Sequence, residues 1–198
     1  MSSTNRSAAR EKHVSDYYVT PLHTIREFLE AFNKDVSFGQ DEPMMILDPC
    51  AGGDATNPMA YPNAITNYSG WNVGQIHTID IRPDSKAMVI GDYLQMTSLQ
   101  PGDYEMALTN PPFNIAMDVI NKCLTEVKPG GWVIMLLRLN FFGSKERQGF
   151  WQKNMPMLTY VNTKRPKFLN TGGTDSIEYA HCCWQVGNPC KFTKLRII

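Results

Sequence analysis

The chain has 198 residues, of which 42% are hydrophobic and 19% are charged. This composition supports a buried core and excludes wholesale disorder, and no apolar run approaches the roughly 18–20 residues of a membrane-spanning helix. The first six residues are polar, so we expect neither a signal peptide nor membrane contact. Five irregularly spaced cysteines predict no disulfide framework and no zinc site, so we expect reduced thiols, no bound metal and a cytoplasmic location.

The net charge is zero, but basic and acidic side chains are unevenly distributed. Residues 1–119 have a balance of −8, from seven Lys or Arg and fifteen Asp or Glu, whereas residues 120–198 have a balance of +8. The neutral total argues against a strong nonspecific polyanion binder, and the basic half leaves room for a local phosphate-binding face. Two solvated surfaces of opposite sign would give the same counts, and charge alone leaves both interpretations open.

The N-terminal part of the chain predicts an arm, a helix and an ambiguous stretch. Residues 1–16 are polar and lack apolar periodicity, which predicts a mobile arm ahead of one folded domain over 17–198. Apolar side chains at helical spacing predict an amphipathic helix over 22–32, with Pro21 in its first turn. Residues 55–70 contain two prolines and many small polar side chains, so they form either a poor helix or a long loop.

Short apolar runs predict five buried strands, and a helical apolar stripe over 115–127 follows the fourth of them. The strands lie at residues 44–47, 75–80, 87–90, 104–108 and 132–137. Strand–turn–helix units in this order are typical of an α/β fold with a doubly wound, mostly parallel sheet and helices on both faces. Two β-like runs at 157–162 and 177–186 predict an antiparallel C-terminal hairpin at one edge, so we expect about seven strands.

Polar and glycine-rich motifs follow four of these strands. The segment from Asp48 to Asp54 follows the first strand, Asp80 ends the second, Asp92 follows the third, and the Asn110-Pro-Pro-Phe113 loop follows the fourth. In an open α/β sheet, ligands bind beyond the carboxyl ends of the strands. Each motif alone could be a turn or a helix cap, but one motif on each of four strands predicts a shared ligand site.

The first loop and Asp80 suit a nucleoside-containing cofactor. Glycines allow a ligand close to the backbone, and an acid about 20–30 residues downstream can accept hydrogen bonds from ribose hydroxyls. The loop lacks the glycine spacing of a pyrophosphate cradle, and Asp48 would repel a pyrophosphate but could hold the ammonium group of a methionine moiety. These features favour S-adenosylmethionine over a dinucleotide.

The Asn110-Pro-Pro-Phe113 loop has the chemistry to activate an exocyclic amine, which is a poor nucleophile because its lone pair is delocalised into the ring. The Asn110 side-chain oxygen and the Pro111 carbonyl can each accept one N–H bond and so free that lone pair for methyl transfer. Pro111 and Pro112 stiffen the loop and fix both acceptors in advance. Phe113 offers a face on which a planar base can stack.

Together with the Tyr18-Val-Thr-Pro21 segment, these motifs resemble the S-adenosylmethionine-dependent N6-adenine DNA methyltransferases, and most closely the compact kind that bacteriophages carry. The resemblance runs from about residue 16 to residue 186. It implies a class I methyltransferase fold, S-adenosylmethionine as cofactor with S-adenosylhomocysteine as product, and DNA with a flipped-out adenine as substrate. It further implies the cytoplasm of a bacterial or phage-infected cell. Because no separate target-recognition domain fits, sequence specificity must come from short loops, from a protein partner or a homodimer, or be low.

The resemblance also implies roles for individual residues. Those expected at the cofactor are Tyr18, Thr20, Pro21, Asp48, Pro49, Cys50, Ala51, Gly52, Asp80, Ile81, Asp92, Tyr93 and Asn110. Those expected in the catalytic loop are Asn110, Pro111, Pro112 and Phe113. Those expected in the late loop that helps to hold the flipped base are Lys164, Arg165, Lys167, Phe168 and Thr174.

The chain departs from the family pattern in three places. The first loop reads Gly52-Gly53-Asp54 where the family usually has Gly-x-Gly, residues 55–70 replace a clean helix, and Phe113 stands where the DNA enzymes often have Tyr or Trp. RNA adenine and protein glutamine are alternative substrates, because their methyltransferases use similar loops. A noncatalytic S-adenosylmethionine-binding subunit is a further alternative, and the intact Asn110 loop argues against it.

Overall fold

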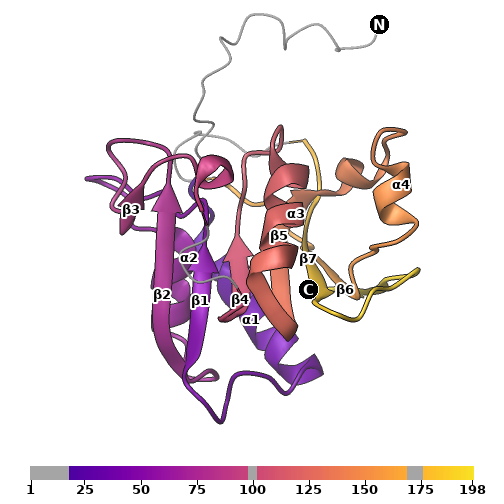
Figure 1. The fold of residues 1–198 in the computed structure, drawn as a ribbon, viewed down its shortest axis with the longest axis horizontal. Coiled ribbons are helices and arrows are strands. Elements are labelled where there is room, and N and C mark those ends of the chain that lie inside the picture. Colours follow the sequence, from indigo (N-terminus) through magenta and orange to yellow (C-terminus); the bar gives the residue numbers. More distant parts are fainter. Residues whose placement is uncertain (1–17, 98–101, 169–175) are drawn as a thin grey trace, which may run out of the picture.

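One eight-stranded sheet forms the middle layer of the protein (Figure 1). The computed structural model describes residues 18–97, 102–168 and 176–198, so the arm expected over residues 1–16 lies outside the described part of the chain. The strand order is β3-β2-β1-β4-β5-β7-β6-β8. This arrangement confirms the predicted α/β fold with a doubly wound, mostly parallel sheet.

The first five strands are mutually parallel, and the order of the chain reverses between β1 and β4. They are β1 (Met44–Asp48), β2 (Val73–Asp80), β3 (Val89–Ile90), β4 (Tyr104–Thr109) and β5 (Val127–Arg138). β1 pairs with β2 on one side and with β4 on the other. The loops that follow β1 and β4 therefore leave the same edge of the sheet in opposite directions, and such a reversal opens a ligand-binding crevice.

The C-terminal strands complete the sheet in antiparallel fashion, as predicted. β6 (Leu158–Val161) and β7 (Tyr179–Gln185) form an antiparallel pair, and β7 lies between β5 and β6. An eighth strand, β8 (Lys194–Ile197), pairs in parallel with β6. The sequence does not predict β8, because basic and apolar residues alternate along its four exposed positions, so no buried apolar run marks it.

The helices cover both faces of the sheet. α1 (Leu22–Asp35) and α2 (Ala60–Thr66) pack on one face. α3 (Ala116–Glu126), α4 (Gln148–Trp151) and the 3₁₀ helices η1 (Tyr93–Gln95) and η2 (Leu139–Phe142) lie on the other. None of the helices in the described ranges is long and apolar enough to cross a membrane.

Two local predictions needed correction or completion. The strand expected over 132–137 already begins at Val127, directly after α3, so β5 includes residues 128–131. The ambiguous 55–70 stretch contains α2, in which Pro62 is the third helical residue. The N–H groups of the first helical turn have no partner within the helix, so a proline there costs little.

The first helix packs against a buried histidine of β7. Pro21 is the N-cap residue of α1 and so precedes its first turn, in which the sequence placed it. Within the helix, the Phe28 ring stacks on His181 of β7, with the two centroids 4.1 Å apart. The Tyr61 hydroxyl of α2 hydrogen-bonds to His181 Nε2 at 2.9 Å. Burial lowers the His181 pKa to about 3, so this imidazole is neutral at physiological pH and links α1, α2 and β7 without a buried charge.

The tight packing of β5 against β4 predicts the effect of a single methyl group at Gly131. A Cβ atom there would lie 2.5 Å from the Glu105 carbonyl oxygen. Gly131→Ala should therefore destabilise the protein by about 1–3 kcal/mol, which lowers the melting temperature by several degrees. Gly149→Ala in α4 is the control, because its Cβ would meet nothing within 4 Å. Equal melting temperatures for the two variants in differential scanning calorimetry would contradict this packing.

Candidate functional site

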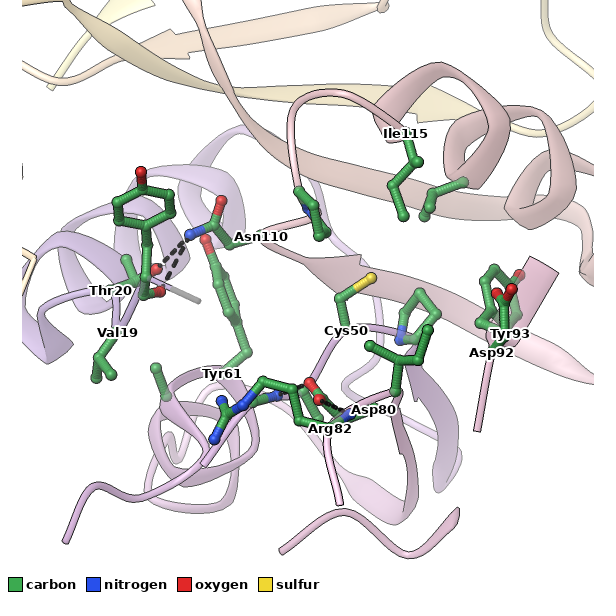
Figure 2. Close-up of a pocket in the computed structure, with 18 of the residues that line it drawn as sticks. Val19, Thr20, Cys50, Tyr61, Asp80, Arg82, Asp92, Tyr93, Asn110 and Ile115 are labelled. Atoms are coloured by element: carbon green, nitrogen blue, oxygen red, sulfur yellow. Dashed lines mark hydrogen bonds between the residues drawn. The ribbon is translucent and has the colours of Figure 1, made fainter. Parts of the chain in front are cut away.

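A cavity of about 530 Å³ opens at the carboxyl ends of the parallel strands (Figure 2). Its size lies within the range typical of small-molecule sites. Most residues expected at the cofactor line it, together with Pro112. These are Tyr18, Thr20, Pro49, Cys50, Ala51, Gly52, Asp80, Ile81, Asp92, Tyr93 and Asn110. Pro21 and Asp48 do not line the cavity.

The Asp80 carboxylate ties the end of β2 to the loop after β1. Its Oδ2 accepts a hydrogen bond from the Gly52 N–H at 2.7 Å, and its Oδ1 accepts one from the Arg82 N–H at 2.9 Å. Gly52 and Gly53 have φ angles of 64° and 76°, a left-handed conformation that favours glycine. Each carboxylate oxygen can accept two hydrogen bonds, so both retain capacity for a donor in the cavity.

Asp92 and Tyr93 face different environments, although they are adjacent. Asp92 caps η1 by accepting a hydrogen bond from the Leu94 N–H at 3.0 Å, and it is half-buried at the cavity wall. The Tyr93 hydroxyl donates to Glu126 Oε2 of α3 at 2.9 Å, and Lys122 Nζ lies 4.4 Å from the Tyr93 ring centroid. The hydroxyl is therefore used within the core, and Tyr93 can offer a ligand only the rest of its surface.

Asp48 is a buried carboxyl group at the end of β1. It is 1% exposed, its Oδ1 accepts a hydrogen bond from the Cys50 N–H at 3.3 Å, and its Oδ2 has no hydrogen-bond partner among the described residues. Burial raises the pKa of Asp48 to about 7, although the hydrogen bond from the Cys50 N–H partly opposes this shift. Asp48, which the sequence analysis expected to hold the ammonium group of a methionine moiety, therefore lies behind the cavity wall.

The Asn110 side chain is held in one orientation by the segment that precedes α1. Its amide nitrogen donates to the Tyr18 carbonyl oxygen at 3.4 Å and to Thr20 Oγ1 at 3.1 Å (dashed lines in Figure 2). A backbone carbonyl can only accept, so the nitrogen and not the oxygen must face Tyr18. The Asn110 Oδ1 atom is thereby directed away from this segment and can act as an acceptor. Next to it, Pro111 is buried and Pro112 lines the cavity.

Phe113 does not line the cavity but belongs to an aromatic cluster beside Asn110, which consists of Tyr18, Phe113, Phe168 and Tyr179. The Phe113 ring stacks on Tyr18 at a centroid distance of 6.3 Å and an interplanar angle of 26°. Phe168 is buried, 5.3 Å from both Tyr18 and Tyr179. The Arg138 guanidinium lies over the Phe113 ring, 4.4 Å from its centroid.

The predicted late loop divides between solvent and core. Lys164 and Lys167 are exposed, and Arg165 Nη2 forms an ion pair with Glu178 Oε1 at 2.6 Å. Phe168 instead points into the aromatic cluster. This segment follows β6, which runs parallel to β5 and so ends at the same sheet edge as the cavity. Thr174 lies outside the described residues.

Sequence reasoning did not identify several residues of the cavity wall. They are Val19, Pro58, Ala60, Tyr61, Arg82, Gly91, Leu94, Asn114, Ile115 and Val119. Most are neighbours of identified motifs, and this proximity is the signal that could have found them. Arg82 follows Asp80 by two residues, and its Nη2 contacts Asp84 Oδ2 at 2.8 Å. Tyr61 could not be placed without knowing that α2 is a helix. No group of three or more potential metal ligands occurs among the residues placed in the structure.

Comparisons with known proteins identify the fold. No family model and no curated protein matches the sequence, but solved structures match most of it. A Listeria monocytogenes protein, provisionally described as a class I S-adenosylmethionine-dependent methyltransferase, matches with a TM-score of 0.61 and 15% identity over 91% of this chain and 65% of that chain. A Pyrococcus horikoshii protein, provisionally described as an RNA methyltransferase, matches with a TM-score of 0.59 and 11% identity over 86% of this chain and 87% of that chain.

A third match is provisionally described as a modification subunit of a type I restriction enzyme from Vibrio vulnificus. Its TM-score is 0.56 and its identity is 13%, over 92% of this chain and 47% of that chain. The chain thus spans less than two thirds of the Listeria and Vibrio proteins. At these identities the likeness concerns the fold, and the chain has the class I methyltransferase fold, as predicted.

The buried Asp48 carboxyl predicts a specific pH dependence of stability. Its pKa is raised in the folded state, so its favourable contribution is complete below about pH 4 and is lost as pH rises through about 7. The unfolding free energy of the wild type, relative to Asp48→Asn, should fall by up to about 1.4 kcal/mol per pH unit between pH 5 and pH 7.

Urea denaturation of both proteins at several pH values measures this difference. Asp103→Asn is the matched control, because this exposed carboxylate precedes β4 at the opposite edge of the sheet. Parallel stability curves for the wild type and Asp48→Asn from pH 5 to pH 8 would contradict the assignment.

Proposed function

We propose that this protein transfers a methyl group from S-adenosylmethionine to the exocyclic N6 amine of adenine in DNA. The observation that carries the proposal is the fixed orientation of Asn110 at the wall of the cavity. Two hydrogen bonds hold its amide nitrogen, so its oxygen is available to an amine. The class I methyltransferase fold supports S-adenosylmethionine-dependent methyl transfer as the general reaction.

The cavity wall fits the proposed cofactor. Asp80 would accept hydrogen bonds from the ribose hydroxyls, since both its oxygens retain acceptor capacity. Asp92 would accept a hydrogen bond from the cofactor's adenine amine, because its capping bond to Leu94 uses one of its acceptor positions. The loop after β1 would face the methionine end. When bound, the cofactor supplies an electrophilic methyl group on a sulfonium centre.

The residues after β4 would prepare the accepting amine. Asn110 Oδ1 and the Pro111 carbonyl would each accept one N–H bond, which holds the nitrogen in place and frees its lone pair. Burial of Pro111 and the rigidity of the two prolines fix these two hydrogen-bonding oxygens before the substrate base binds. The amine proton can leave to water after transfer, so this scheme needs no catalytic base.

DNA is the proposed acceptor because the chemistry of the Asn110 loop suits a flipped base, and two lysines of the basic half lie at the same sheet edge. Lys164 and Lys167 are exposed after β6, at the sheet edge of the cavity, and can contact phosphates. RNA adenine is the alternative favoured by the likeness to the Pyrococcus protein, and protein glutamine is a further one. Target recognition by a protein partner or a second copy stays a prediction, as does a cytoplasmic location.

The proposal is tested by offering the protein radiolabelled S-adenosylmethionine with DNA, RNA and protein acceptors in parallel. Nucleoside mass analysis of the product should identify N6-methyldeoxyadenosine. If only RNA or only protein became labelled, that molecule and not DNA would be the methyl acceptor. Cofactor binding without transfer to any acceptor would favour the noncatalytic subunit.

Cofactor binding predicts a measurable ligand effect on stability. S-adenosylmethionine should raise the melting temperature, whereas NAD should not, because the site has no pyrophosphate cradle. Asp80→Ala should weaken calorimetric cofactor binding by roughly 1–3 kcal/mol, because it removes a buried acceptor and releases the Gly52 loop. Asp103→Ala, at the far edge, should bind normally. Binding of NAD in place of S-adenosylmethionine would refute this assignment.

The catalytic role of Asn110 predicts a separation of rate from cofactor affinity. Asn110→Ala should lower the rate of methyl transfer by ~10²–10³, since it removes one of two preorganised acceptors. Cofactor affinity should change little, because the removed oxygen faces the amine. Asn188→Ala, in an exposed turn, is the matched control. Full activity of Asn110→Ala with normal cofactor binding would contradict a catalytic role and show that this loop is only a structural turn.

A further inference from the structure

The Phe113 ring is flanked by two groups of different chemistry. Tyr18 lies nearly parallel to it at a centroid distance of 6.3 Å, whereas the Arg138 guanidinium carbon lies 4.4 Å from the Phe113 centroid. The same guanidinium lies 6.0 Å from the Tyr179 ring centroid, and the Phe113 and Tyr179 centroids are 5.9 Å apart. Arg138 is therefore shared between Phe113 and Tyr179, whereas Tyr18 is a separate ring neighbour of Phe113.

Arg138 is held in this position by the adjacent strand. It is the last residue of β5 and pairs in register with Tyr179, the first residue of β7. Its Nε donates a hydrogen bond to the Tyr179 hydroxyl at 3.1 Å. The planar guanidinium is thus fixed by a directional bond as well as by ring contact, an arrangement that the flexible ammonium of a lysine does not reproduce.

The opposite side of Phe113 has a second ring of similar orientation beside it. The planes of Tyr18 and Phe113 differ by 26°, and their centroids are 6.3 Å apart. Carbon–carbon contacts are optimal at about 3.5 Å, so we expect a base that enters here to displace the two rings until each lies about that far from it. The Tyr18 carbonyl also orients Asn110, so a base at this position lies beside the proposed amine acceptors.

We propose that Arg138 is a positioning residue for the methyl acceptor, an inference that rests on the proposed function. Its guanidinium supports Phe113 from behind, so the acceptor's ring binds on the side that faces Tyr18. Arg138 acts on the acceptor through Phe113 and contacts neither the cofactor nor the phosphates of a nucleic acid.

The test compares Arg138→Gln with Arg138→Lys in two measurements. The first is equilibrium binding of a fluorescently labelled, adenine-containing DNA duplex in the presence of S-adenosylhomocysteine, over a range of salt concentrations. The second is steady-state methyl transfer to the same duplex. Arg138→Gln should weaken binding and raise KM by about 2- to 30-fold, the range of a cation–π contact, with a smaller change in kcat. Arg138→Lys should fall between Arg138→Gln and the wild type.

Arg147→Gln is the matched control. The Arg147 guanidinium lies 4.2 Å from the Phe141 ring centroid, and its Nε donates to the Phe141 carbonyl at 2.8 Å. It thus makes the same kind of contact on the other face of the sheet, where Phe141 belongs to the core. Arg147→Gln should lower the stability of the protein about as much as Arg138→Gln does, but it should leave duplex binding and KM unchanged.

A double-mutant cycle separates action through Phe113 from other effects. In a Phe113→Leu background, Arg138→Gln should cause no further loss of duplex binding. A loss that persists there would overturn the inference. So would a fall of about one in the logarithmic salt slope, which indicates a direct phosphate contact, or an equal loss of cofactor affinity.

These outcomes are distinguishable from failure of the proposed function itself. A wild-type protein that neither binds S-adenosylhomocysteine nor transfers a methyl group contradicts the proposed function. A wild-type protein that does both, alongside an Arg138→Gln variant with unchanged duplex binding and KM, contradicts the role of Arg138 alone.

Discussion

The reversal of strand order between β1 and β4 is the constraint on which the site depends. It sends the loop after β1 and the loop after β4 away from each other at one edge of the sheet, and the cavity opens between them. The Asp80 carboxylate then fixes one wall by holding the Gly52 N–H. Pro111 and Pro112, which follow Asn110, stiffen the opposite wall. Neither wall is formed by a single segment, so the site exists only in the assembled sheet.

The short segment of residues 18–20 connects the two halves of this site. The Tyr18 carbonyl and the Thr20 hydroxyl orient Asn110, while the Tyr18 ring stacks on Phe113. The same segment lines the cavity in which we place the cofactor. A displacement of this segment would therefore disturb both the proposed amine acceptor and the proposed base site, which couples the two physically.

The sequence predicts most of the architecture but not the direction of individual side chains. Strand runs and loop motifs were readable because burial and turn chemistry leave periodic signals, whereas β8 is exposed and leaves none. Asp48 and Tyr93 lie in identified motifs, yet the Asp48 carboxyl and the Tyr93 hydroxyl are buried in the core. Arg138 was not singled out, because a charged residue at a strand end is usually solvated, and its ring contact depends on the pairing of β5 with β7.

The most direct test of the account is a crystal structure of the protein with S-adenosylhomocysteine. The account predicts the product within the cavity, with its ribose hydroxyls hydrogen-bonded to Asp80 and its sulfur directed toward Asn110 Oδ1. The Asn110 nitrogen should still donate to the Tyr18 carbonyl. Product bound outside the cavity, a sulfur turned away from Asn110, or an Asn110 oxygen that no longer faces the acceptor side would contradict it.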